Sequence, residues 1–249
     1  MLTLAGLLIG LAIGLTGVGG GVLTAPLLIL FFHMPPALGV GTALLFSTGV
    51  KIVSAGLFTV RRQVHGRTLL LLLAGGVPGA IAGPLLLGRA GGSGAAPWVA
   101  LAVGATVCAT AGYSLLRVCH EPRPRRQRTA WLPLFSFPIG LEVGFSSAGA
   151  GALGTVLLFS QTELEPAQVV GTDLLFGLAV SACAGGMHLA AGNWDPDVLF
   201  KLLAGGVFGA LAGAQLAGRF PARPLRAIIL SWAVLLGLIL AWNGLQKAL

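Results

Sequence analysis

Long apolar runs separated by short polar stretches make up almost the whole sequence. Six of these runs cover residues of about 38–60, 68–88, 97–117, 168–190, 198–218 and 225–243. Each is close to the ~20 residues that a helix needs to cross a bilayer. Two further apolar stretches, at about 3–32 and 131–160, are interrupted by clusters of small residues. The pattern predicts an all-α integral membrane protein.

The two interruptions have related sequences. GVGGG at 17–21 separates two apolar runs, and SSAGAG at 146–151 does the same later in the chain. Adjacent glycines disfavour a continuous helix. Within a membrane, non-helical backbone is tolerated only where it is buried in protein or lines a cavity. Two interrupted segments at matching places in two halves indicate a transporter binding site.

An ungapped repeat relates the halves at an offset of 130 residues. GTALLF at 41–46 returns as GTDLLF at 171–176, and AGGVPGAIAG at 74–83 returns as AGGVFGALAG at 204–213. We therefore predict a first transmembrane repeat at 1–117, a basic cytoplasmic linker at 118–130 and a second repeat at 131–249. Each homologous half consists of one glycine-broken helix, which is re-entrant or crosses once at a tilt, and three transmembrane helices.

The charges of the loops favour an inverted repeat over a parallel one. Equivalent loops differ in charge, because Arg61, Arg62 and Arg67 correspond to a loop that carries Asp195 and Asp197. If the halves are inverted, the basic loops at 61–67, 117–128 and 219–226 all face the cytoplasm, as the positive-inside rule requires. A parallel arrangement leaves three arginines outside.

Composition agrees with a multi-pass protein of the cell inner (plasma) membrane, whose partner is the lipid bilayer. Only 9% of residues are charged and 56% are hydrophobic, whereas soluble domains carry roughly 25% charged residues. The net charge of +8 lies mainly in short loops, so we expect no nucleic-acid partner. The three scattered cysteines form no metal or disulfide framework, and we expect no cofactor. A homodimer is left open.

The starts of the helices after the two breaks are candidate anion sites, because helix N-termini present free N–H groups and a positive dipole end. Recurring Gly-Thr pairs near the next helix of each half supply further hydroxyls. The candidate substrate-binding residues are Gly19, Gly20, Gly21, Thr24, Thr42, Ser146, Ser147, Gly149, Gly151 and Thr172. The alternative is structural: glycines serve close helix packing, and threonines bond the carbonyl one turn back.

Few charges lie inside the apolar segments, and each needs a partner or a function. We predict coupling or charge roles for Asp173, Lys51 and Glu142. Asp173 either carries a coupling proton or pairs with Lys51. For His188 we favour a structural role. No motif for nucleophilic, metal-dependent or ATP-dependent catalysis is present, so we expect no enzyme, and uphill transport has to use an ion gradient or the membrane potential.

The chain resembles the sulfite exporter TauE/SafE family, also called the toluene sulfonate uptake permease family. The resemblance rests on the stretch from Gly10 to Gly21, on VGTDLL at 170–175 and on the stretch from His188 to Gly213. It implies an inner-membrane permease of two similar halves that moves sulfite, sulfonates or related organosulfur anions against a proton gradient. Phe208 stands where a proline is usual, and Ala148 and Ala150 make the second break looser.

We therefore expect a proton-coupled secondary transporter, a permease or exporter, for a small anion. Two alternatives remain. A membrane-embedded enzyme or enzyme subunit would use Asp173, Glu142 and His188. An anion channel would conduct without a gradient.

Overall fold

The computed structural model describes residues 1–17, 20–90, 96–119, 129–216 and 222–248, and over these residues it consists of helices and connecting turns. The first half contains α1 (Leu2–Thr16), α2 (Gly21–Phe31), α3 (Pro36–Val60), α4 (Gly66–Ala90) and α5 (Ala96–Cys119). A 3-10 turn, η1 (Thr129–Trp131), precedes α6 (Leu132–Ser146), α7 (Leu153–Gln161), α8 (Pro166–Ala190), α9 (Pro196–Leu216) and α10 (Ala222–Ala248).

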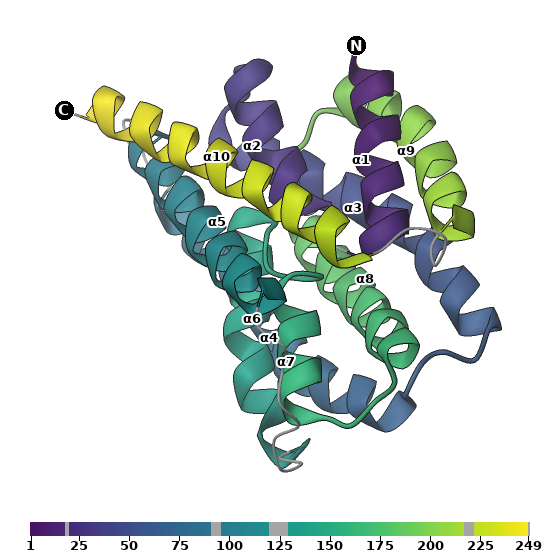
Figure 1. Cartoon of the computed structure of the whole chain (residues 1–249). Helices are drawn as coiled ribbons and strands as arrows, with labels where there is room; N and C mark the ends of the chain where they lie inside the picture. Colours follow the sequence, from purple (N-terminus) through teal and green to yellow (C-terminus); the bar gives the residue numbers. More distant parts are fainter. Residues whose placement is uncertain (18–19, 91–95, 120–128, 217–221, 249) are drawn as a thin grey trace.

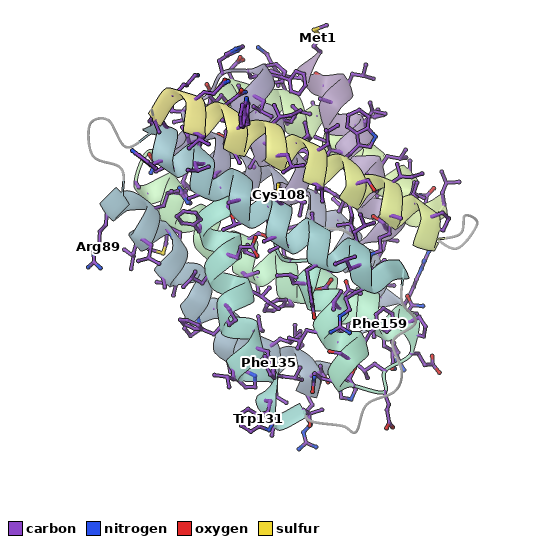
Figure 2. All side chains as sticks on the ribbon, turned by 60° about the vertical axis from the view of Figure 1, so that its left-hand side comes forward. Met1, Arg89, Cys108, Trp131, Phe135 and Phe159 are labelled. Atoms are coloured by element: carbon purple, nitrogen blue, oxygen red, sulfur yellow. The ribbon has the colours of Figure 1, made fainter. Side chains whose placement is uncertain are left out.

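Among the described helices, six are long and apolar enough to cross a membrane: α3, α4, α5, α8, α9 and α10. Large apolar side chains cover the outside of the bundle, including Trp232, Trp242 and Phe200. In Figure 2 carbon sticks dominate this outer surface, and Trp131 lies at the lower end of the molecule. Phe208 is 69% exposed, so the residue that replaces the usual proline belongs to this outer surface. The molecule is a multi-pass membrane protein.

Both broken helices end in the same way. α1 ends at Gly17, which has φ 68°, and α6 ends at Ser147, which has φ 64°. The amide of each residue donates to a carbonyl one turn back, at Ile13 and Val143 respectively. A left-handed residue that closes a helix in this way is a common C-terminal cap. The equivalent helices α3 and α8 both begin with proline, Pro36 and Pro166, a favoured first helical residue.

Contacts between helices show the direction in which each one runs. The start of α3 lies against the end of α8, where Gly41 contacts His188, and the end of α3 lies against the start of α8, where Phe58 contacts Gly171. These two equivalent helices are therefore antiparallel. α5 and α10 are antiparallel as well and lie side by side in both figures. Antiparallel equivalent helices support an inverted repeat, whose orientation in the membrane stays a prediction.

Each broken segment turns back on itself. α1 runs parallel to α9, with Gly6 against Leu202 and Gly14 against Ala210, and α9 runs parallel to α3. Because α1 and α3 point in the same direction, α2 has to return between them. The contacts of α6 with α4, and of α4 with α8, give the same result for α7. Figure 1 shows α1 and α2 in the upper part of the molecule, and α6 and α7 in the lower part.

One prediction from the sequence is wrong, and another falls mostly on residues outside the described part of the structure. The stretch 219–226 was expected to be a cytoplasmic loop, but residues 222–226 already belong to α10. Pro224 is tolerated there because the first turn of a helix needs no amide hydrogen at that position. Most of the predicted linker, 120–128, lies outside the described residues.

Candidate functional site

The two breaks lie in direct contact with each other. Gly21, the first residue of α2, packs against the backbone carbonyl and the hydroxyl of Ser147, so closely that a Cβ atom at position 21 would overlap both oxygens. Ser147 is 6% exposed, and its Oγ has no hydrogen-bond partner among the described residues. The helix-breaking residues of the two halves therefore pack against each other.

The described part of the first break combines backbone and hydroxyl groups with the apolar side chain of Ile13, which packs on Gly20. Gly20 precedes α2, and the fully buried Thr24 donates a hydrogen bond of 2.7 Å to the Gly20 carbonyl. Thr24 therefore bonds one turn back, as the structural alternative anticipated. Gly19 lies outside the described residues.

The second break carries the polar chemistry. Gly149 and Gly151 have φ of 92° and 88°, a backbone conformation that favours glycine. Glu142 on α6 places Oε2 beside Gly149, and the Ser146 hydroxyl faces the other carboxylate oxygen at 3.4 Å. The Ser146 hydroxyl also accepts the amide of Ala148 at 3.2 Å. A buried carboxyl group and a buried hydroxyl thus border the loop between α6 and α7.

An arginine from the last helix reaches into this break. Nη2 of Arg226 donates to the Gly151 carbonyl at 2.8 Å and to Thr155 Oγ1 at 2.6 Å. The Thr155 hydroxyl is in turn 2.6 Å from Oδ2 of Asp173 on α8. The other carboxylate oxygen, Oδ1, has no hydrogen-bond partner among the described residues. Arg226, Thr155 and Asp173 thus form a hydrogen-bonded chain that connects α10, the start of α7 and α8.

The site residues predicted from the sequence contain neither Arg226 nor Thr155, although Thr155 is one of the hydroxyl residues near the start of the helix after the second break. Arg226 follows a proline in an arginine-rich stretch, which is typical of a loop. One feature of the sequence indicates Thr155. It lies four residues after Gly151, just as Thr24 lies four residues after Gly20. Both threonines bond the glycine carbonyl one turn back.

Lys51 lies where the two halves meet. Its Nζ is 3.2 Å from the Ser181 hydroxyl, and these two positions are equivalent in the 130-residue repeat. Lys51 and Asp173 are each 2% exposed and interact electrostatically. Over the residues that the structure describes, the one ion pair within 4.0 Å is the exposed pair Lys201–Asp197. Lys51 and Asp173 therefore interact electrostatically but do not form an ion pair within 4.0 Å.

The Gly-Thr pairs hold loops in place. The Thr42 hydroxyl accepts the amide of Asp195 at 3.0 Å, and the Thr172 hydroxyl accepts the amide of His65 at 3.0 Å. The first bond connects α3 to the loop before α9, and the second connects α8 to the loop before α4. These contacts give both threonines a structural role, and contact with a substrate stays a prediction for them.

His188 is buried and lies within reach of the second break. Its Nε2 is 3.3 Å from the Gly144 carbonyl, two residues before Ser146, and its Nδ1 has no partner among the described residues. His188 also borders a cavity of about 310 Å³ between the ends of α4 and α8, whose lining includes Arg89 and Asn193.

Charged side chains and helix N-termini lie close together at the second break. Two cationic side chains, Lys51 and Arg226, surround one carboxylate, Asp173, and the N-termini of α2 and α7 start at the breaks. Where all three side chains are ionised, one positive charge is left over.

Comparisons with known proteins agree with a membrane transporter. The profile of the family described as "Sulfite exporter TauE/SafE" matches residues 2–240. "Probable membrane transporter protein YjnA" of Bacillus subtilis is 28% identical over 246 residues, which cover 94% of this chain and 96% of that protein. "Probable membrane transporter protein YtnM" of the same organism is 32% identical over 229 residues, which cover 86% of this chain and 73% of that protein. No solved structure matches significantly. The chain belongs to the TauE/SafE family of membrane transporters.

Proposed function

We propose that the chain is a secondary transporter of a small sulfur-containing anion, such as sulfite or a sulfonate, across the inner membrane. The observation that carries the proposal is the contact of the Arg226 guanidinium with the second break, inside a membrane protein. Transport of sulfite in particular rests on the family description.

The anion binds where the two breaks meet. The N-terminus of α7 and the guanidinium of Arg226 attract it, and Lys51 adds a second positive charge. Glycines at 149 and 151 leave the backbone open to close approach by a ligand. Because Gly21 packs directly on Ser147, the halves have to separate slightly to admit the anion, which suits a carrier that closes around its substrate.

Asp173 is the residue we assign to proton coupling. It is buried, and one of its oxygens lacks a partner among the described residues, so it can take up and release a proton as its surroundings change. Intramembrane carboxyl groups commonly have this role in transporters. An enzyme that uses Asp173, Glu142 and His188 together is less well supported, because each of the three bonds to a different partner.

Flux into proteoliposomes tests the proposal. Purified protein is reconstituted, and entry of radiolabelled sulfite and methanesulfonate is followed with and without a pH gradient. We expect saturable flux that the gradient accelerates, and loss of that acceleration in Asp173→Asn. Flux that is equally fast without a gradient would indicate a channel. Flux equal to that of protein-free liposomes for both anions would refute the proposal.

A further inference from the structure

Asp173 and a bound anion have to share the same two cations. Arg226 from α10 and Lys51 from α3 both interact electrostatically with the Asp173 carboxylate. The Thr155 hydroxyl bonds Oδ2 of that carboxylate, and Oδ1 is buried without a hydrogen-bond partner among the described residues. An anion placed next to Arg226 therefore repels Asp173 and competes with it for the same positive charges.

The Thr155 hydroxyl can serve Asp173 in both of its protonation states. This hydroxyl lies 2.6 Å from Asp173 Oδ2, 2.8 Å from the Gly151 carbonyl and 2.6 Å from Nη2 of Arg226. A hydroxyl has one proton to donate and two lone pairs to accept with. When Asp173 is ionised, Thr155 donates to it. When Asp173 is protonated, the carboxyl group donates to Thr155, and the hydroxyl proton goes to Gly151.

No other titratable side chain in the described structure occupies this position. On α6, the Glu142 carboxylate lies near the Ser146 hydroxyl and beside Gly149. On α8 itself, His188 bonds the Gly144 carbonyl. The arginines described on α4, Arg67 and Arg89, are exposed near its ends. The His65 ring bonds Thr68, while only its backbone amide reaches α8. Asp173 is therefore the group whose charge an anion at Arg226 affects most directly.

We propose that the anion and a proton bind to the second break together, the anion at Arg226 and Lys51 and the proton on Asp173. Protonation of Asp173 raises the charge of the three side chains from +1 to +2, and this attracts the anion. The anion in turn favours protonation, since coupling between two binding sites is reciprocal. A carrier loaded in this way moves both in the same direction. The site is thus built for proton–anion symport, which an inward proton gradient drives as uptake.

This inference rests on the proposed function, and binding to the purified full-length protein tests it. Methanesulfonate and thiosulfate are suitable probes because both stay fully ionised from mildly acidic to mildly alkaline pH. We expect both anions to bind at least about fivefold more tightly at mildly acidic pH, the low end of usual coupling between sites. Addition of either anion to protein in weak buffer should also raise the pH of the solution, because the protein takes up a proton.

Two variants locate the proton. Asp173→Asn should abolish the proton uptake and make anion affinity independent of pH. Asp197→Asn removes an exposed carboxylate outside the break and should retain both effects. The uptake measurement on the unmodified chain keeps the test valid if Asp173→Asn does not fold. Anion binding that releases protons, exchanges none, or takes them up through Glu142 would overturn the symport inference. The last two results would also remove the proton-coupling role proposed for Asp173, whereas transport of the anion itself would still stand. Failure of the unmodified chain to bind either anion at any pH would overturn both.

Discussion

At the scale of single residues, the decisive feature is that the charges gather on one of two similar breaks. Glu142, Asp173 and Arg226 border the second break, whereas alanine occupies the equivalent positions 12, 43 and 96 in the first half. The halves share a backbone plan but have different chemistry. We infer that the second break holds the ligand and that the first break, through Gly21, closes over it.

Arg226 should be more sensitive to substitution than any exposed cation. Arg226→Gln removes the positive charge and weakens two hydrogen bonds, and charge-assisted hydrogen bonds contribute about 1.5–3 kcal/mol each. We expect anion flux into proteoliposomes to fall by at least about tenfold, which corresponds to ~1.4 kcal/mol. Lys201→Gln is the matched control, since its exposed pair with Asp197 contributes little. Equal flux in both variants would remove Arg226 from the site.

Thr172 should matter more for stability than for ligand binding. Thr172→Val leaves the amide of His65 without its acceptor, and an unsatisfied buried donor costs about 1–3 kcal/mol. We expect a lower apparent melting temperature in detergent and an unchanged apparent KM for the anion. Thr59→Val is the control, because Thr59 is exposed and bonds only its own helix. A raised KM with unchanged stability would make Thr172 a substrate ligand instead.

At the scale of elements, glycines let the broken helices pack against their neighbours at close range. Gly75, Gly79 and Gly83 of α4 face the backbone of α6, and Gly205, Gly209 and Gly213 of α9 face the backbone of α1 in the same way. Within a membrane the hydrophobic effect does not drive helices together, so the van der Waals contacts made at such close approach stabilise their association. These contacts hold α1 and α6 in place and so fix where the two breaks meet.

One pair of substitutions within α4 tests this packing. A Cβ atom at Gly79 would overlap the Phe137 carbonyl, whereas nothing lies within 4 Å of one at Gly88. We expect Gly79→Ala to destabilise the protein by about 1–3 kcal/mol, as overpacking usually does. Gly88→Ala should be neutral or slightly stabilising, because alanine favours helix. Thermal unfolding in detergent measures both, and equal melting temperatures would contradict the packing described.

Much of the element plan could be predicted from the sequence, since apolar runs give the spans and runs of small residues mark the two breaks. The left-handed residue is Gly17 after α1 and Ser147 after α6. The start of α10 could not be predicted, because Arg223, Pro224 and Arg226 have the composition of a loop. For the same reason the contact between Arg226 and the second break was missed. Such a contact depends on how distant helices pack, which hydrophobic periodicity does not record. Lys51 and Asp173 were predicted as candidates because charges are rare in apolar spans, and their roles stay predictions.

At the scale of the whole molecule, the account needs the two halves to be inverted in the membrane. The antiparallel pairs α3–α8 and α5–α10 support this arrangement. The equivalent positions Arg61 and Ala191 are both exposed, one after α3 and the other after α8. In inverted halves, these two positions face opposite sides of the membrane. A parallel arrangement would place them on the same side.

Labelling from one side distinguishes the two arrangements. Arg61→Cys and Ala191→Cys are made in a background without the native cysteines and treated in intact cells with a membrane-impermeant maleimide. We expect labelling at 191 only, because the arginine-rich loop at 61–67 should face the cytoplasm. Lysed cells provide the control, in which both positions should react. Labelling of both cysteines in intact cells would exclude the inverted repeat.

The position of the bound anion tests the central claim most directly. An experimental structure of the protein with selenite, whose selenium scatters anomalously and which resembles sulfite in shape and charge, would locate it. If the anion binds where the two breaks meet, an anomalous peak lies within hydrogen-bonding distance of Arg226 and Thr155, between Gly21 and the second break. A peak elsewhere in the molecule, with these side chains unchanged and the two breaks still in contact, would contradict it.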